Sequence, residues 1–221
     1  MFSDAPTIIE PRQGQADAAV VLLHGLGASG HDLAPLLPAL GLPESLKVRF
    51  VLPHAPRLAV TVNGGYEMPA WYDILEMNLG RRVDEAQLKA SAAYIHELVD
   101  GQIASGIDSH RIVIAGFSQG GAVAYEAALT YPQPLAGLLA LSTYFATAGS
   151  ITPSEANRQL PVEAHHGSRD SVVPESLGRA GAEAARGMGY PVDYRTYAMG
   201  HEICPEQIGA IARWLTARLA V

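Results

Sequence analysis

The sequence predicts an α/β protein whose mostly parallel β-sheet is covered by helices on both faces. Short runs rich in leucine and β-branched residues alternate along the chain with longer segments whose apolar residues recur at helical spacing. The run AAVVLL is apolar throughout, as expected of a strand buried on both faces of a parallel sheet. Ligands of such sheets bind at the carboxyl ends of the strands, so functional residues are expected in the loops that follow strands.

The amino-terminal part of the chain supplies three strands and three helices in alternating order. Pro53 stops the second strand, and apolar residues at helical spacing mark the second helix. The third helix is rich in alanine, the residue with the highest helix propensity. We expect these six elements at 18–23, 32–40, 48–52, 84–99, 111–115 and 120–130.

Strands and helices also alternate in the carboxy-terminal part of the chain. The run VDYRTY alternates between apolar and polar residues and reads as a strand with one solvated face. Pro205 stands in the first turn of the last helix, where its missing N–H leaves no hydrogen bond unmade. We expect strands at 135–141, 161–165 and 192–197, and helices at 175–187 and 205–219.

The stretch between Leu52 and Asp84 does not fit this alternation of strands and helices. It contains Gly64-Gly65, Pro69 and several aromatic residues, and connections of this length usually have a function or form a small structure of their own. Two interpretations of this stretch remain open: it is either an irregular surface loop or the wall of a binding pocket. No connection after the middle of the chain is long enough for a separate cap domain.

Composition limits the class of protein. A chain of 221 residues with 48% apolar residues suits one domain spanning residues 1–221. The 15 basic and 22 acidic residues give a net charge of −7 without a basic cluster, which argues against nucleic acid or an anionic membrane as partner. Cys204 is the one cysteine, so an internal disulfide is excluded and a reducing compartment fits.

Neither a targeting signal nor a membrane segment is expected. The amino terminus lacks the basic start and apolar stretch of a secretory signal. The apolar runs are too short to cross a bilayer. We therefore expect a cytoplasmic protein without stable membrane insertion, and the sequence leaves monomer and homodimer equally open.

The segment Gly116-Phe117-Ser118-Gln119-Gly120 matches the pattern G-x-S-x-G between an expected strand and an expected helix. This context is typical of a serine nucleophile on a sharp turn, with its hydroxyl standing free above the sheet. Bulky side chains two residues to either side would collide in such a turn, which explains the glycines. The pattern predicts an α/β-hydrolase fold with Ser118 as nucleophile.

A serine nucleophile needs a base, and the base needs an acid that orients it. In this fold the chain order is serine, then acid, then histidine. His201 is the one histidine that follows the first plausible acid, Asp170, and both residues come shortly after expected strands. Asp193 is the rival acid, but it lies within an alternating strand where it would face solvent.

Acyl transfer also needs hydrogen-bond donors for the developing oxyanion. One candidate is the backbone N–H of Gln119, and the other is that of Leu26 in the glycine-rich loop after the first strand. A plain tight turn before a helix is the alternative for that loop. A phosphate-binding loop is a weaker interpretation, because the later acidic residue of a dinucleotide site and the lysine of a P-loop are missing. Histidine spacing does not suggest a zinc site, so we expect no metal and no cofactor.

Six segments in order resemble the phospholipase/carboxylesterase family, which includes acyl-protein thioesterases and small bacterial carboxylesterases. They are LLHGLGASG, FVLPHAP, GGYEMPAWYDI, AGFSQGGAVA, HGSRDSVVP and MGHEI, and the resemblance extends over most of the chain. It implies an esterase that uses the triad and the two oxyanion donors named above. It also implies that the GGYEMPAWYDI segment lines the acyl site, where we expect Trp71, Tyr72 and Met68.

We therefore expect a serine carboxylesterase that hydrolyses short- to medium-chain esters of small molecules through an acyl-enzyme. Acyl-protein thioesterase or lysophospholipase activity on the same triad is the alternative. A peptidase or a carbon–carbon hydrolase would need an amine-recognising pocket or a larger cap. A non-catalytic scaffold would not require the triad and the oxyanion loop.

Overall fold

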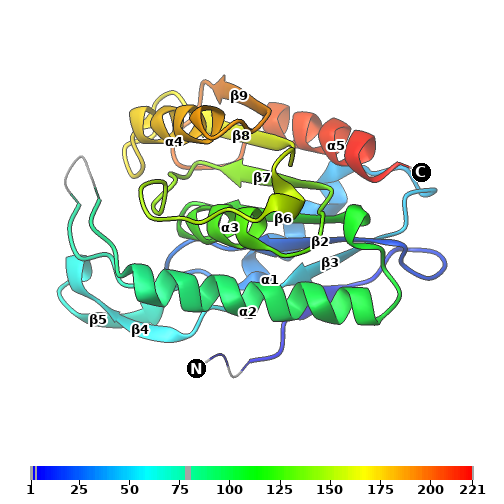
Figure 1. Ribbon diagram of the computed structural model, residues 1–221, viewed down its shortest axis with the longest axis horizontal. Coiled ribbons are helices and arrows are strands. Elements are labelled where there is room, and N and C mark those ends of the chain that lie inside the picture. The colour runs from blue at the N-terminus through cyan, green and yellow to red at the C-terminus, as the bar shows by residue number, and fades with distance from the viewer. Residues whose placement is uncertain (1, 3, 78–80, 221) are drawn as a thin grey trace.

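A seven-stranded sheet forms the centre of the molecule (Figure 1). The computed structural model describes residues 2, 4–77 and 81–220. Neighbouring strands run parallel except at one edge, where β1 pairs antiparallel with β3. In spatial order the strands are β1 (Thr7–Ile9), β3 (Val48–Leu52), β2 (Ala18–Leu23), β6 (Ile112–Phe117), β7 (Gly137–Leu141), β8 (Val162–Gly167) and β9 (Val192–Tyr197).

Helices cover both faces of the sheet, which confirms the predicted fold class. Because successive strand residues point to opposite faces, Val21 and Ile114 pack toward one helical layer, and Val20 and Val113 toward the other. The first layer holds α2 (Glu85–Ala104), α3 (Gln119–Thr130) and α4 (Glu175–Gly187). The second holds α1 (Gly30–Leu33), the 3-10 helix η1 (Ala34–Leu40) and α5 (Pro205–Leu219).

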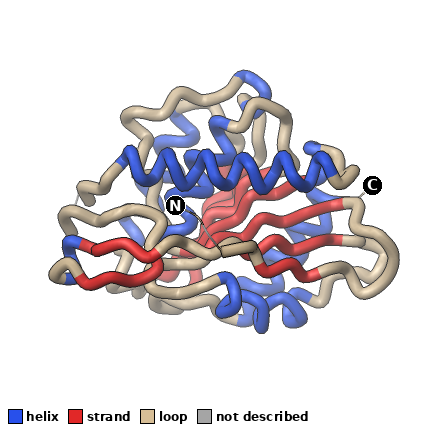
Figure 2. Tube along the Cα trace, turned by 90° about the horizontal axis from the view of Figure 1, so that it is seen from below, coloured by secondary structure: helices blue, strands red, loops and turns tan. Residues whose placement is uncertain are grey.

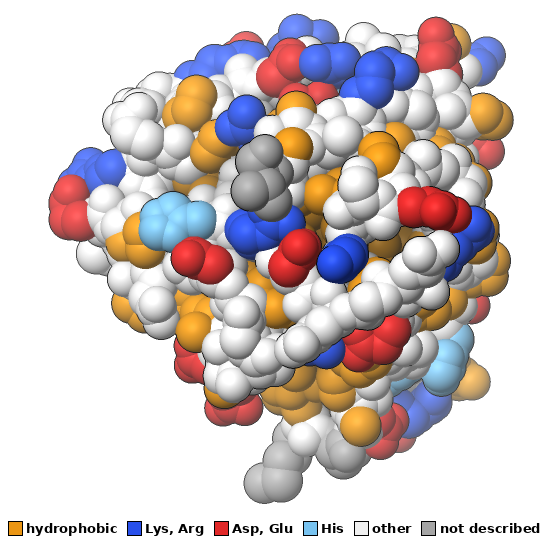
Figure 3. All heavy atoms as spheres, turned by 90° about the vertical axis from the view of Figure 1, so that its right-hand side faces the viewer, with side chains coloured by type: hydrophobic (Ala, Val, Ile, Leu, Met, Phe, Trp, Pro, Cys, Tyr) orange, Lys and Arg blue, Asp and Glu red, His pale blue; other side chains and the backbone are white. Residues whose placement is uncertain are grey.

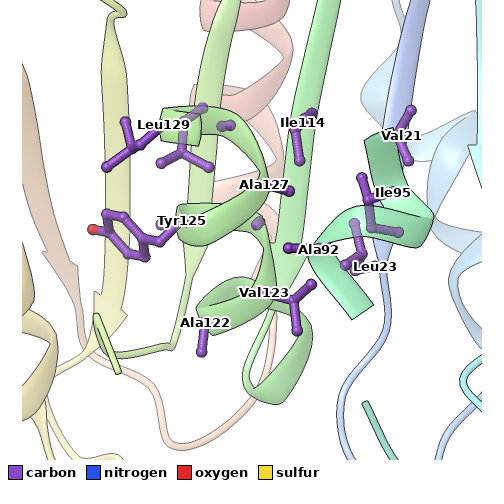
Figure 4. Packing of buried hydrophobic residues seen from close by; sticks show 14 of the residues in the cluster. Val21, Leu23, Ala92, Ile95, Ile114, Ala122, Val123, Tyr125, Ala127 and Leu129 are labelled. Atoms are coloured by element: carbon purple, nitrogen blue, oxygen red, sulfur yellow. The ribbon is translucent and has the colours of Figure 1, made fainter. Parts of the chain in front are cut away.

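Helix α3 is deeply buried and begins beside the loop that follows β2. All its residues from Gln119 to Leu129 are buried, and its side chains meet those of α2, β2 and β6 (Figure 4). Its first turn touches β2 so closely that a Cβ on Gly120 would lie 2.5 Å from the carbonyl oxygen of His24. This approach brings the start of α3 beside the loop that follows β2.

Most predicted elements have the predicted bounds within a few residues. The helix expected at 32–40 is one α-helical turn followed by 3-10 turns that contain Pro38, which lacks the N–H of a regular helix. The three-residue strand β1 was not predicted, because periodicity cannot identify so short an element.

The unusual stretch after β3 forms a small structure of its own. Strands β4 (Arg57–Val60) and β5 (Tyr66–Pro69) pair antiparallel and lie beside the main sheet (Figure 2). The 3-10 helix η2 (Thr61–Asn63) joins them. The other 3-10 turns are η3 (Ser109–Arg111) and η4 (Glu155–Asn157).

Charges of both signs are interspersed on the face shown in Figure 3, with hydrophobic side chains exposed between them. Within the described part of the chain, the helices are too short or too polar to span a bilayer.

The contact between α3 and β2 predicts a large effect of Gly120→Ala. The added methyl group would meet backbone and Cβ atoms that have no room to move, so we expect a loss of about 1–3 kcal/mol in the free energy of unfolding. Gly101→Ala in α2 is the matched control, because a Cβ there meets nothing within 4 Å. That change should stabilise the helix by about 0.5–1 kcal/mol. Urea titrations followed by circular dichroism measure both, and equal midpoints would contradict this account of the packing.

Candidate active site

Ser118 stands on a strained turn between β6 and α3. Its backbone has φ 55° and ψ −120°, in the region that residues with a side chain rarely adopt. A Cβ on Gly116 would lie 2.3 Å from the carbonyl oxygen of Gly120, so the turn closes only with glycine at this position. The turn presents the Ser118 side chain at the carboxyl end of the strand.

The structure brings Ser118, His201 and Asp170 together from three loops. His201, between β9 and α5, places Nε2 2.9 Å from Ser118 Oγ. Its Nδ1 lies 2.7 Å from Oδ2 of Asp170, which follows β8. A carboxylate only accepts hydrogen bonds, so Nδ1 carries the proton and Nε2 is free to accept one from the serine hydroxyl.

The loop that carries Asp170 is itself held in place. Asp170 Oδ1 accepts hydrogen bonds from the backbone N–H groups of Val172 and Val173, at 2.9 and 2.8 Å. His166 on β8 donates from Nε2 to the carbonyl oxygen of Val173 at 2.8 Å. Burial lowers the pKa of His166, so this ring is neutral and acts as a strut for the acid loop. Sequence reasoning did not single out His166, because its role depends on the fold of that loop.

Asp193 has a different environment from Asp170. It lies on β9, where its carboxylate pairs with Arg195 on the same strand at 2.5 Å. Both side chains are largely exposed. The structure therefore places Asp170, and not Asp193, beside His201.

The loop after β2 carries the backbone N–H of Leu26. Among the described residues this group has no hydrogen-bond partner, whereas the neighbouring N–H of Gly27 donates to the carbonyl oxygen of Pro69 at 2.8 Å. Gln119 is the first residue of α3, so its N–H has no acceptor one turn earlier in the helix. Both predicted oxyanion donors thus belong to segments that lie against each other at the contact of Gly120 with β2.

The side chain of Gln119 connects this turn to the segment after β5. Its Oε1 accepts from the backbone N–H of Trp71 at 2.9 Å, and its Nε2 donates to the carbonyl oxygen of Tyr72 at 2.7 Å. The indole N–H of Trp71 donates to the carbonyl oxygen of His24 at 2.8 Å. Gln119 and Trp71 therefore tie together the Ser118 turn and the loop after β2.

The expected acyl-site wall needs a correction. The exposed fractions of Trp71 and Tyr72 are 1% and 0%, so neither side chain lies open to a substrate. Tyr72 OH lies 2.8 Å from Tyr144 OH, and burial keeps both phenols protonated by raising their pKa values. Met68 is half-buried, with its sulfur near Gly27. Of the three expected residues, Met68 alone is partly exposed, and its side chain lies beside the loop after β2.

A small apolar cavity of about 40 Å³ lies below Phe117, the residue before Ser118. The Phe117 ring packs against that of His201, with centroids 4.8 Å apart. A larger cavity of about 230 Å³ lies elsewhere, between β1, β3 and η1. Within the described ranges, no group of three or more histidine, cysteine or carboxylate side chains is arranged to hold a metal ion.

His24 supports the loop after β2 in its neutral form. Its Nδ1 donates to the carbonyl oxygen of Gly25 at 2.7 Å, and its Nε2 accepts from the N–H of Ala55 at 3.0 Å. Protonation would turn that acceptor into a donor facing another donor. Burial lowers the pKa of this ring below its usual value, with the Gly25 bond opposing.

We expect acid to destabilise the protein partly through His24. Because the pKa of His24 is lower in the folded than in the unfolded chain, its contribution is complete above about pH 6.5 and is lost as the pH falls below that value. His24→Gln should make the free energy of unfolding less dependent on pH between 7 and 5. Some dependence should remain, because burial also lowers the pKa values of His54 and His166.

Urea titrations at each pH measure the free energy of unfolding of the wild type and of His24→Gln. An unchanged pH dependence in His24→Gln would contradict the assignment of a buried neutral ring.

Comparisons with known proteins agree with this geometry. The model of the family described as Phospholipase/Carboxylesterase matches residues 4–219. Acyl-protein thioesterase 1 of Gibberella zeae is 38% identical over 96% of this chain and 95% of that protein. The protein of the same name from Neurospora crassa is 40% identical over 97% of this chain and 92% of its own length.

A solved structure gives the same result for the fold. Acyl-protein thioesterase 2 of Zea mays superposes with a TM-score of 0.86 at 28% identity and covers 99% of this chain and 100% of its own. Because the family model covers nearly the whole chain, this protein belongs to the phospholipase/carboxylesterase family of α/β hydrolases.

Proposed function

We propose that this protein is a serine esterase that hydrolyses carboxylic esters through an acyl-enzyme. The observation that carries the proposal is the chain of two hydrogen bonds from Ser118 Oγ to His201 Nε2 and from His201 Nδ1 to Asp170. This arrangement lies at the carboxyl ends of parallel strands, where α/β proteins bind their ligands.

The first half of the reaction forms the acyl-enzyme. His201 Nε2 takes the proton of the Ser118 hydroxyl while Oγ attacks the carbonyl carbon of the ester. The backbone N–H groups of Leu26 and Gln119 donate to the oxyanion of the tetrahedral intermediate. The imidazolium then gives its proton to the leaving alcohol, and Asp170 stabilises the imidazolium while it carries the charge.

The second half releases the acid. His201 takes a proton from a water molecule, the resulting hydroxide attacks the acyl carbon, and the proton returns to Ser118 as the ester bond to the enzyme breaks. The aspartate changes no bond in either half. It holds the imidazole in the tautomer that both proton transfers need.

The apolar side chains beside this centre suit an acyl chain. Leu26 in the loop after β2 and Met68 beside that loop are partly exposed. Val172, two residues after Asp170, has 47% of its surface exposed. Short- to medium-chain acyl esters of small molecules are the proposed substrates. Trp71 and Tyr72 act behind this surface by holding Gln119.

Thioester hydrolysis is the second candidate activity. The relatives named acyl-protein thioesterase 1, at 38% and 40% identity, favour it. The same triad and donors serve a thioester, because the thiol replaces the alcohol as leaving group. A lysophospholipid would use the same attack on its acyl carbonyl. The single cysteine supports a reducing, cytoplasmic location of the protein, whichever of the three substrates it hydrolyses.

Ser118→Ala should abolish esterase turnover, because no other group can form the acyl-enzyme. The expected loss of kcat is on the order of 10⁴–10⁶. Asp170→Asn should reduce kcat by roughly 10⁴, since an amide in place of the carboxylate stabilises the wrong tautomer of His201. A p-nitrophenyl ester assay measures both, and labelling with a fluorophosphonate identifies the nucleophile by mass spectrometry.

Asp193→Asn is the matched control for the acid. Its partner Arg195 lies on the same exposed strand, so kcat should stay near the wild-type value. Full activity in Ser118→Ala, or a larger loss in Asp193→Asn than in Asp170→Asn, would overturn the proposed roles.

The chain-length profile separates the proposed substrates. With p-nitrophenyl esters, each added methylene should lower the activation free energy for kcat/KM by about 0.8 kcal/mol at most. The resulting rise in kcat/KM should then level off, as expected of an uncovered groove that ends after a few carbons. Matched acyl thioesters and lysophospholipids measured at the same chain lengths decide which leaving group is preferred. A jump in rate when the substrate forms droplets would reveal a lid and contradict the uncovered groove.

A further inference from the structure

The turn that follows β7 lies directly against the Ser118 turn. Strands β6 and β7 are neighbours, with Phe117 paired to Leu141, so the residues that follow them meet at the same edge of the sheet. Ser142 has φ 46°, so β6 and β7 are each followed directly by a serine with a positive φ. Such conformations persist only where their surroundings determine them.

Hydrogen bonds from the β7 turn hold both backbone polar groups of Ser118. The Ser118 N–H donates to the carbonyl oxygen of Leu141 at 2.9 Å. The Thr143 hydroxyl donates to the carbonyl oxygen of Ser118 at 2.6 Å, whereas its distance to the carbonyl oxygen of Tyr144 is 3.5 Å. Thr143 is buried, so water does not compete for this bond.

The carbonyl of Ser118 and the N–H of Gln119 belong to one peptide group. In a trans peptide the two are coplanar and point in opposite directions. A donor that fixes the direction of the Ser118 carbonyl therefore fixes the direction of the Gln119 N–H as well. That N–H is one of the two proposed oxyanion donors.

Thr143 also packs tightly against the start of α3. A Cβ on Gly121 would lie 2.6 Å from its side chain, so glycine at this position leaves room for Thr143 beside the Ser118 carbonyl. The N–H groups of Gly121 and Ala122 donate to the same Ser118 carbonyl at 2.9 and 3.4 Å. Without the hydroxyl, only these helical N–H groups would orient the peptide.

We propose that Thr143 is a positioning residue that sets the plane of the Ser118–Gln119 peptide. Its hydroxyl aims the Gln119 N–H at the oxyanion and keeps the Ser118 turn in its reactive shape. This inference rests on the proposed function of Ser118 as nucleophile. It assigns no bond-making step to Thr143, which acts only through its neighbour.

Such a role has a kinetic signature. The oxyanion exists in the tetrahedral intermediate and not in the bound substrate, so misdirecting the Gln119 N–H should lower kcat and leave KM nearly unchanged. Affinity for a boronic acid, which forms a tetrahedral adduct with serine, should fall by the same factor as kcat/KM. Lost stability by itself would not produce this pattern in the folded enzyme.

The experiment compares Thr143→Val and Thr143→Ala with Thr143→Ser in the full-length protein. Valine keeps the shape of threonine without the hydroxyl, alanine removes both, and serine keeps the hydroxyl. We expect kcat for a p-nitrophenyl ester to fall roughly 10- to 100-fold in the valine and alanine variants, with KM within about 2-fold. The serine variant should stay within about 3-fold of the wild type, and inhibition by phenylboronic acid should follow kcat/KM.

Thr147→Val is the matched control. Thr147 is a buried threonine in the same loop, and its hydroxyl donates to Glu126 Oε2 at 2.5 Å, not to the Ser118 turn. This variant should melt at a lower temperature while its kcat stays unchanged. An unchanged kcat in folded Thr143→Val or Thr143→Ala, or an equal loss in Thr143→Ser, would overturn the role of the hydroxyl.

Fluorophosphonate labelling tests the nucleophile Ser118 and the role of Thr143 separately. Labelling at Ser118 in the wild type, with slower labelling in Thr143→Val, is the expected result. Labelling at Ser118 with the same rate in both proteins would overturn the Thr143 assignment alone. A wild-type protein that is not labelled at Ser118 would overturn the proposed function and, with it, the inference built on it.

Discussion

The strained backbone at Ser118 is the constraint on which the rest of the site depends. A positive φ at a residue with a side chain is unfavourable, so the surroundings must leave the chain no alternative. Gly116 and Gly120 approach each other too closely for any Cβ, and Gly120 lies against β2. The same contacts that force the turn also bring α3 beside the loop after β2, where the second proposed oxyanion donor lies.

Buried hydrogen bonds then determine the shape of each functional loop. Gln119 and His24 hold the segment around Trp71, while His166 holds the loop that carries Asp170. A buried polar group without a partner is costly, so these hydrogen bonds favour one arrangement of each loop. The proposed catalytic groups are thereby oriented before a substrate binds, which is how an esterase stabilises charge without rearranging in the transition state.

The sequence predicted the sheet, the helices on both faces and the residues that meet in the site. Continuous apolar runs and helical spacing identified strands such as 18–23 and helices such as 205–219 with their observed bounds. The order of motifs along the chain selected Ser118, Asp170 and His201 among many serines, aspartates and histidines. Burial of Trp71 and Tyr72 was not predicted, because an aromatic residue in a long loop can face either the core or a substrate.

What the sequence by itself determined was the set of elements and the chemistry of the groups at the strand ends, because periodicity and local motifs depend only on neighbours along the chain. Only the tertiary structure decided which distant groups share a hydrogen bond. Thr143 donates to Ser118 across 25 residues, and His166 supports Asp170 through the carbonyl of Val173. No local pattern reports such pairs, since their energy arises from burial and close packing that exist only once the sheet has formed.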